Sequence, residues 1–275
     1  DNYAYEFVLK NYKKLFNGSS IVFCGVENFN KNSIPKELER YVTGVIEYKE
    51  IKENLDLIKK TISDLNTIYI VSDDTFSSNA IKEQILNDIK NFDKSINVIF
   101  DNQIDISTLS QKVNSLPQNS AVLFTSLYVD KNGKFITYSQ LRDFFNSSKY
   151  PVFAINKIHL HEGIVGGIMV NPLDQGMEAT KKAIEIFEGK KPNEIEISTP
   201  SSKYYFDYKI LEKYQINSSK IPLLSTIINE PKSFFEENRK FIDSAFVMLP
   251  LLLLLIIGLI VNIFKRVSLE IKYIE

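Results

Sequence analysis

Three short clusters contain residue types that bind metals or phosphate. Residues 159–162 (His-Leu-His-Glu) place two imidazoles beside a carboxylate, as zinc sites do, but no second ligand pair accompanies them, so a solvated loop is the simpler interpretation. Residues 130–133 (Asp-Lys-Asn-Gly) begin like a calcium loop, yet the glycine comes early and no glutamate closes the loop, which favours a turn. Residues 163–167 are glycine-rich but lack GxGxxG spacing, which indicates tight packing rather than a phosphate cradle. We therefore predict no metal ion and no cofactor.

Common catalytic and nucleotide-binding motifs are also missing from the sequence. The sequence has no GxSxG, HExxH or P-loop motif. Its single cysteine, Cys24, lies in the apolar run 21–24, where a small buried hydrophobe is a simpler interpretation than a reactive thiol. A lone cysteine also excludes an intramolecular disulfide. We expect no enzyme activity from this segment, and a membrane-anchored enzyme is a minor alternative.

Polar side chains follow several apolar runs that read as strands. The carboxyl ends of parallel strands form the ligand crevice of open α/β sheets. Carboxylates, amides, hydroxyls and aromatic rings placed there would orient a small polar or zwitterionic ligand, such as one with amino-acid-like chemistry, with a carboxylate pairing with a ligand amine. The candidate ligand-binding residues are Glu27, Asn28, Asp73, Thr75, Tyr128 and Asn156. The alternative is that these are ordinary solvated loop residues.

The elements that would position these residues alternate between strand and helix. Short β-branched or aromatic runs occupy 21–25, 42–46, 67–71, 96–100, 121–125 and 151–155, and an extended glycine-rich run occupies 164–170. Helical spacing occurs over 2–16, 51–65, 79–92, 106–116, 137–147 and 174–189. Repeated strand–helix units predict a doubly wound α/β fold with a mainly parallel sheet.

The C-terminal region reads as a membrane span. No charged residue occurs in 244–264, and a helix of that length covers about 30 Å, the thickness of bilayer hydrocarbon. A core helix would carry a polar stripe, but this one is apolar all round. Lys265 and Arg266 flank its C-terminal side, so the positive-inside rule favours a cytoplasmic C-terminus and an extracytoplasmic, periplasmic location for residues 1–243.

Composition excludes some partners. The 275 residues include 33 basic and 34 acidic side chains, so no basic excess suggests nucleic-acid binding. With 44% hydrophobic residues the chain can bury a substantial core. The partners we expect are a small ligand and a membrane, and homodimerisation is left open.

Several of these runs, in their order along the chain, resemble a known family. They are Phe-Cys-Gly-Val-Glu-Asn-Phe at 23–29, Val-Thr-Gly-Val at 42–45, Ile-Val-Gly-Gly at 164–167, Gln-Gly-Met-Glu-Ala at 175–179 and Ile-Phe-Glu-Gly-Lys-Lys-Pro at 186–192. The chain resembles the transporter-substrate-binding-protein-like domain of the type I periplasmic-binding fold. It is most similar to the version that serves as the extracytoplasmic sensor of bacterial membrane histidine kinases and diguanylate cyclases.

The resemblance implies two α/β lobes that close on a small ligand. It assigns 1–50 to part of a first lobe, 51–170 to the second lobe, 171–225 to a return segment with C-terminal elements, 226–243 to a juxtamembrane linker, 244–264 to the span and 265–275 to the start of a cytoplasmic signalling helix. About 50 residues before the crossover are fewer than the family's first lobe contains, so we expect an upstream portion of that lobe.

Two functions follow from the resemblance. The favoured one is a sensor module that signals by lobe closure through the span. The alternative is a membrane-anchored substrate-binding protein of an ABC-type transporter, although such proteins are usually anchored at their N-terminus. Kinase and cyclase catalytic motifs do not occur in this segment.

Overall fold

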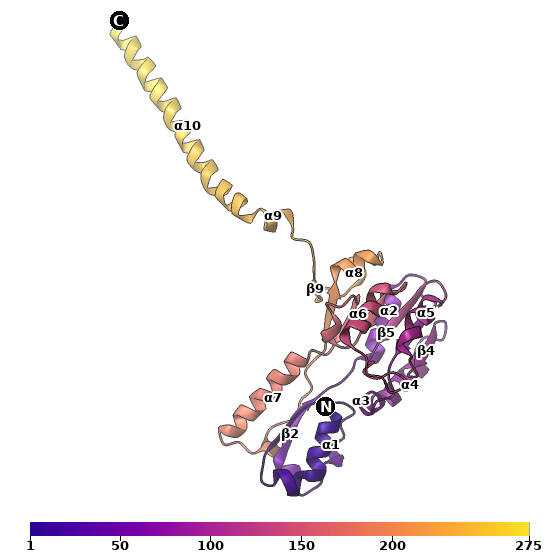
Figure 1. Cartoon of the computed structure of the whole chain (residues 1–275). Coiled ribbons are helices and arrows are strands. Elements are labelled where there is room, and N and C mark those ends of the chain that lie inside the picture. The colour runs from indigo at the N-terminus through magenta and orange to yellow at the C-terminus, as the bar shows by residue number, and fades with distance from the viewer. Residues whose placement is uncertain (275) are drawn as a thin grey trace. The chain divides into compact units, whose positions relative to one another are not determined.

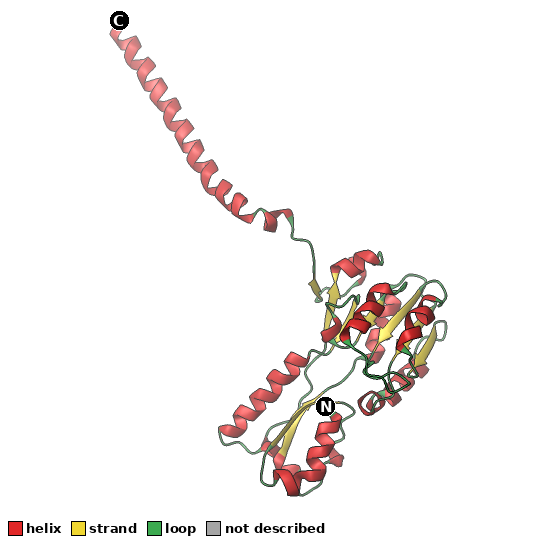
Figure 2. Cartoon of the chain, in the orientation of Figure 1, coloured by secondary structure: helices red, strands yellow, loops and turns green. Residues whose placement is uncertain are grey.

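The computed structural model describes residues 1–274, with side chains described as far as Ser268. Two compact units make up the chain: Asp1–Asn229 forms the first, and the second begins at Glu230. The first unit contains a two-stranded and a seven-stranded sheet (Figure 1). The predicted α/β fold with a mostly parallel sheet is therefore confirmed (Figure 2).

The seven-stranded sheet has the strand order β4-β3-β5-β6-β7-β8-β9. Its strands are β3 (Thr67–Val71), β4 (Asn97–Asp101), β5 (Ser120–Phe124), β6 (Val152–Ala154), β7 (Gly166–Met169), β8 (Lys203–Asp207) and β9 (Thr226–Ile228). Strands β3 to β7 are parallel, β8 is antiparallel to β7, and β9 is parallel to β8. We call this sheet and its helices the second lobe.

Helices bury both faces of this sheet. Along β3, Ile68 and Ile70 belong to one apolar core, whereas Tyr69 and Val71 belong to the other, as the alternation of side chains in a strand requires. The first core includes side chains of α2 (Ile51–Thr61), α4 (Lys82–Asn91) and α8 (Tyr208–Lys213), and the second those of α5 (Ile106–Asn114) and α6 (Tyr138–Ser147). Burial on both faces explains why β3 and β5 are continuous apolar runs.

Glycine is required where β7 passes between its neighbours. A Cβ on Gly166 would overlap the carbonyl oxygen of Tyr205, and one on Gly167 would overlap that of Ala154. Gly166 also has a φ of 150°, which side chains rarely adopt. The glycine-rich run thus serves close strand packing, as its sequence indicated.

The first lobe is built around two parallel strands, β1 (Ile21–Val26) and β2 (Val42–Ile46). Helix α1 (Asn2–Asn11) continues into a π-helical turn, Tyr12–Phe16, and α7 (Pro172–Phe187) packs on both strands after the chain has returned from the second lobe. Short 3-10 helices occur at Lys31–Ser33, Glu39–Tyr41, Lys157–His159, Pro192–Glu194 and Ser218–Lys220. Cys24 is half-buried in β1 rather than buried.

Three differences from the sequence expectations concern helices and edge strands. The segment 79–92 is not one helix, because α3 (Phe76–Ala80) ends at Ile81 before α4 begins. The helix expected over 51–65 ends at Thr61, since Ile62 is extended and Asp64 has a φ of 52°. Elements β8, α8 and β9 were not predicted.

The second unit is almost entirely helical. Short α9 (Phe234–Glu237) precedes α10 (Arg239–Ile274), which contains the charge-free stretch 244–264 and carries Pro250 within it. By length and composition, Arg239–Ser268 could cross a membrane. The segment 265–275, predicted to begin a cytoplasmic helix, is helical through Ile274, and residue 275 lies outside the described residues.

Candidate functional site

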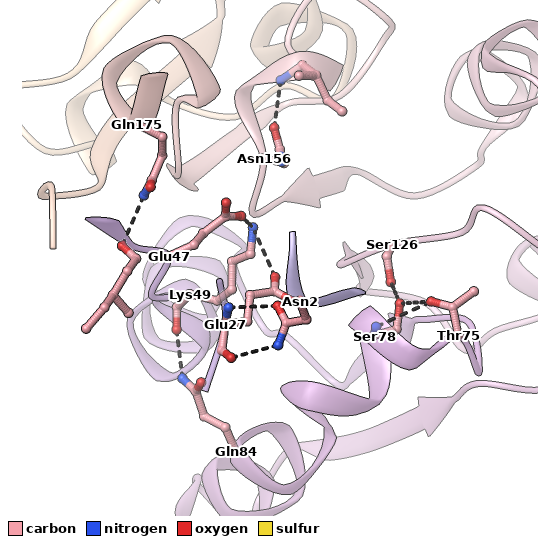
Figure 3. Close-up of polar contacts among 12 residues, drawn as sticks. Asn2, Glu27, Glu47, Lys49, Thr75, Ser78, Gln84, Ser126, Asn156 and Gln175 are labelled. Carbon is pink, nitrogen blue, oxygen red and sulfur yellow. Dashed lines mark hydrogen bonds and ion pairs between the residues drawn. The ribbon is translucent and has the colours of Figure 1, made fainter. Parts of the chain in front are cut away.

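Glu27, Glu47 and Lys49 form a charged cluster where the chain leaves the first lobe, and we call these three residues the carboxylate–lysine cluster (Figure 3). Glu27 follows β1, whereas Glu47 and Lys49 follow β2. The Lys49 ammonium lies 3.5 Å from Glu27 Oε1 and forms an ion pair with Glu47. From α4 in the second lobe, Gln84 donates a hydrogen bond of 2.7 Å to the Lys49 carbonyl, which ties the cluster to that lobe.

The carboxylate–lysine cluster carries one more carboxylate than ammonium. Burial raises the pKa of Glu27 to about 7, Lys49 opposes this rise, and the negative charge of Glu47 adds to it. Only 13% of the Glu27 side chain is exposed, so water screens it poorly. Asn2 holds the backbone of Glu27 through two hydrogen bonds of 2.9 Å. The site is therefore suited to a positively charged group.

Asn28 lies beside Glu27, and both residues line one hollow. Asn28 is exposed and has a φ of 49°, and the hollow, of about 740 Å³, is also lined by Tyr3 and Phe7 of α1. Phe76 of the second lobe also lines this hollow, and its ring meets that of Tyr3 edge-on at 5.1 Å.

Asp73 joins two loops of the second lobe. Only 2% of the residue is exposed. One carboxylate oxygen accepts hydrogen bonds from the backbone N–H and the hydroxyl of Thr75, at 3.2 and 2.7 Å, and the other accepts one from the backbone N–H of Tyr128. A further chain of hydroxyls runs from Thr75 through Ser78 to Ser126 (Figure 3). The loops that follow β3 and β5 therefore lie together, as predicted. The Asp73 carboxylate, however, accepts hydrogen bonds from within the second lobe.

Replacing Asp73 by asparagine is expected to destabilise the second lobe. The amide group of the variant would present a donor where the carboxylate accepts, so the free energy of unfolding should fall by about 1–3 kcal/mol. Urea denaturation measures this, with Asp74→Asn as an exposed control expected to change stability by less than about 0.5 kcal/mol. Unchanged stability together with weakened ligand binding would instead make Asp73 a ligand contact.

Tyr128 lies in the loop after β5. Half of the residue is exposed. Partial burial raises its pKa to about 12, and the negative charges of Glu27 and Glu47 contribute to the rise. The phenol therefore lies within the field of the carboxylate–lysine cluster, and it stays protonated and able to donate a hydrogen bond at neutral pH.

His159 is buried rather than solvated, which corrects the expectation for residues 159–162. Its ring packs edge-on against Phe124 and Phe145, with centroids 5.0 and 5.7 Å apart. Burial lowers its pKa to about 4, and Lys49 contributes to the lowering. Nδ1 has no hydrogen-bond partner among the described residues, and the ring borders a small cavity of about 60 Å³ that Tyr128 also lines. Within the described part of the chain, no group of three His, Cys, Asp or Glu residues could hold a metal ion.

Asn156 follows β6 within the second lobe, and Gln175 lies within α7. Asn156 is half-buried, and its side chain accepts a hydrogen bond of 3.1 Å from the Ile158 N–H, which caps the following 3-10 helix. Gln175, near the start of α7, is buried and donates to the Ile46 carbonyl at 3.2 Å. Its Oε1 has no partner within the described residues.

Four residues of this region were not among the ligand-binding candidates chosen from the sequence: Glu47, Lys49, His159 and Gln175. A signal for the first two was present, because both follow the strand-like run 42–46 closely, as the chosen candidates follow theirs. His159 and Gln175 gave no such signal, since their burial depends on helices packed from elsewhere in the chain.

Comparison with known proteins places this geometry in context. A family model described as ABC transporter substrate binding protein matches residues 13–225. No curated protein matches the chain.

Solved structures share the fold at low sequence identity. A conserved domain protein from Vibrio cholerae is 15% identical, with a TM-score of 0.51 over 68% of this chain and 62% of that one. An ABC domain from Streptococcus pneumoniae in complex with L-Trp is 16% identical, with a TM-score of 0.53 over 68% and 63%. The ligand-free, open form of a substrate-binding protein with adhesive properties from Clostridium difficile is 15% identical, with a TM-score of 0.52 over 72% and 67%. The chain thus spans just over three fifths of the length of the first two.

Proposed function

Because this chain belongs to the ABC transporter substrate-binding protein family, we propose that it is the extracytoplasmic, ligand-binding sensor module of a membrane signal-transduction protein. The observation that carries this proposal is the order of its parts. A binding fold is followed in the same chain by α10, one continuous helix from Arg239 to Ile274 that includes the apolar stretch. A change in the binding fold would therefore reach the far side of a membrane through a single helix. Binding, rather than catalysis, is the role that this family membership supports.

We propose that the ligand carries an ammonium group and has amino-acid-like chemistry. The excess carboxylate in the carboxylate–lysine cluster would pair with the ammonium, and the Tyr128 hydroxyl would donate to a ligand oxygen. The L-Trp complex of the similar Streptococcus pneumoniae domain supports an amino-acid-like ligand. Asn28, Thr75 and Asn156 remain candidate contacts from the neighbouring loops.

Signalling requires that the ligand favour one arrangement of the lobes. A ligand shifts this equilibrium only by its difference in affinity for the open and closed states. Glu27 and Glu47 belong to the first lobe, whereas Tyr128 belongs to the second. A ligand that contacts both sets would therefore stabilise the closed state.

The alternative is a membrane-anchored substrate-binding protein of an ABC-type transporter, which the description of the matched family favours. A chimera separates the two functions. The chain, fused after residue 268 to the cytoplasmic kinase of a known sensor, should change phosphorylation with a half-saturation equal to the ligand's Kd. Unchanged phosphorylation despite tight binding, with loss of ligand uptake when the gene is deleted, would instead assign the chain to transport.

Cysteine labelling is expected to place residue 219 outside the cytoplasm and residue 268 inside it. The charge-free stretch and the Lys265–Arg266 flank predict this orientation. In intact cells carrying the Cys24→Ser background, an impermeant maleimide should label Ser219→Cys, whereas Ser268→Cys should react only after lysis. The reverse pattern would show that the orientation is wrong.

A further inference from the structure

Two aromatic rings, those of Tyr3 and Phe76, join the lobes. Tyr3 belongs to α1 in the first lobe, Phe76 begins α3 in the second, and the two helices are in contact (Figure 1). The ring centroids lie 5.1 Å apart and the ring planes meet at 74°, which is the edge-to-face geometry that aromatic pairs favour. The two residues are 69% and 44% exposed and belong to neither lobe's apolar core. The contact therefore joins the lobes without being part of their interiors.

Each ring is carried by a backbone that is held in place. The Asp1 side chain caps α1 by accepting a hydrogen bond of 2.7 Å from the Ala4 N–H, and the Asp1 amino group donates to the Cys24 carbonyl of β1 at 3.2 Å. The Thr75 hydroxyl caps α3 by accepting a hydrogen bond of 3.3 Å from the Ser78 N–H. Because both backbones are anchored within their own lobes, a movement of one lobe against the other would act directly on the ring contact.

The ring contact lies on one side of the first lobe, and a connection between the lobes lies on the other. Strand β2 has β1 on one edge and Ser198, in the segment that returns to the second lobe, on the other. The Ile46 N–H donates to the Ser198 carbonyl at 2.8 Å. Helix α1 packs against β1, so Tyr3 lies on the opposite side of β2 from the return segment. A rotation about the return segment would therefore part or join the rings.

The same two rings border the largest hollow near the carboxylate–lysine cluster. Tyr3, Phe76 and Glu27 all line this hollow of about 740 Å³, a volume within the range of small-molecule sites. A contact between two aromatic rings favours the joined over the parted state by only about twofold to twelvefold. Such a contact can hold the lobes together without preventing them from opening.

We propose that Tyr3 and Phe76 form an inter-lobe latch, which biases the unliganded chain towards the state in which the two rings touch over the Glu27 hollow. The apparent affinity of a ligand scales with the fraction of protein in the binding-competent state. The latch therefore sets the affinity for every ligand that favours the closed lobes, whatever the chemistry of that ligand. This inference rests on the lobe closure of the proposed function, but it depends on neither the ligand nor the output.

Distances between two spin labels test the latch on the full chain, in detergent micelles and without ligand. In the Cys24→Ser background, nitroxides are attached at Lys14→Cys in the first lobe and Gln118→Cys in the second, both at exposed positions. The parent should show a joined and a parted population, with the joined one dominant. Phe76→Ala and Tyr3→Ala should each lower the ratio of joined to parted protein by about twofold to twelvefold.

Two further variants separate the ring contact from a general effect of substitution. Phe76→Tyr keeps a ring at this position, so its distance distribution should resemble that of the parent. Phe135→Ala is the matched control, because Phe135 is also an exposed phenylalanine of the second lobe but does not line the hollow. Its distribution should equal that of the parent.

The double variant shows whether the two residues act through one contact. Each single substitution removes the same contact, so Tyr3→Ala with Phe76→Ala should match the single variants, whereas independent effects would multiply. Multiplied effects, or a parent distribution that neither single substitution changes, would overturn the latch. A ligand that binds yet leaves the distribution of the parent unchanged would instead contradict signalling by lobe closure, so the two failures are distinguishable.

Discussion

Replacing Glu27 by glutamine is expected to weaken binding of an ammonium ligand about tenfold to a hundredfold. A hydrogen bond between charged groups contributes about 1.5–3 kcal/mol, and each 1.4 kcal/mol is a factor of about ten in Kd. Glutamine keeps the shape of Glu27 but loses its charge, leaving Lys49 paired with Glu47 alone. Calorimetric titration with the amine or amino acid that a thermal-shift screen identifies measures the loss. Glu37→Gln, on the exposed surface of the same lobe, is the matched control.

The same substitution should stabilise the unliganded protein at alkaline pH. Burial raises the pKa of Glu27 from 4.5 to about 7, so the fold favours the protonated form. The associated stability is therefore fully present below about pH 4.5 and is lost as the pH rises through about 7. Ionising this carboxyl costs the fold up to about 3 kcal/mol. Glu27→Gln removes this cost, so its thermal midpoint should exceed that of the parent at about pH 8 and approach it at about pH 5.

Ligand affinity should follow the opposite pH dependence. Only the ionised carboxylate pairs with an ammonium, so affinity should rise from about pH 6 to about pH 8 by about tenfold and then level off. In Glu27→Gln this slope should vanish. A parent protein with pH-independent affinity, or a variant that binds as tightly as the parent, would show that the ligand does not use Glu27.

The cores of this protein could be predicted well from its sequence, and its edges poorly. Strand β3 coincides with the predicted run 67–71, because a strand buried on both faces must be apolar throughout and is bounded by polar turns. Strand β8 reads Lys-Tyr-Tyr-Phe-Asp and shows no such run. It pairs with β7, more than 30 residues earlier, and with β9, so its partners are not indicated by its own short run.

The candidate site was predictable to the same limited extent. The rule that ligands bind at the carboxyl ends of parallel strands places Asp73 and Tyr128 at one edge, where a hydrogen bond does join them, but their role in ligand binding stays a prediction. It could not show that the Asp73 carboxylate would accept the Tyr128 N–H, since those residues are 55 positions apart. Nor could the rule show that Lys49 would be only 4% exposed. The burial of Lys49 depends on how α4 packs against the segment between β2 and α2.

Replacing Gly167 by alanine is expected to destabilise the second lobe strongly. The new Cβ would overlap the Ala154 carbonyl oxygen of β6 and would lie 2.9 Å from Asn54 Oδ1. Neither neighbour can move freely: Ala154 is in the sheet, and Asn54 exchanges two hydrogen bonds of 2.9 Å with the backbone of Ile168. Overpacking costs about 1–3 kcal/mol and backbone strain about as much again, so the free energy of unfolding should fall by about 2–6 kcal/mol.

Gly176→Ala is the matched control for this loss. Gly176 lies within α7, and nothing within 4 Å would meet its Cβ, so alanine there should leave stability unchanged or raise it by about 0.5–1 kcal/mol. Denaturant titration of both variants compares the two effects. A domain has only about 5–15 kcal/mol of stability. A Gly167→Ala variant that yields no folded protein would therefore agree with the prediction. A Gly167→Ala variant as stable as Gly176→Ala would instead mean that β7 does not approach β6 and α2 as closely as its glycines indicate.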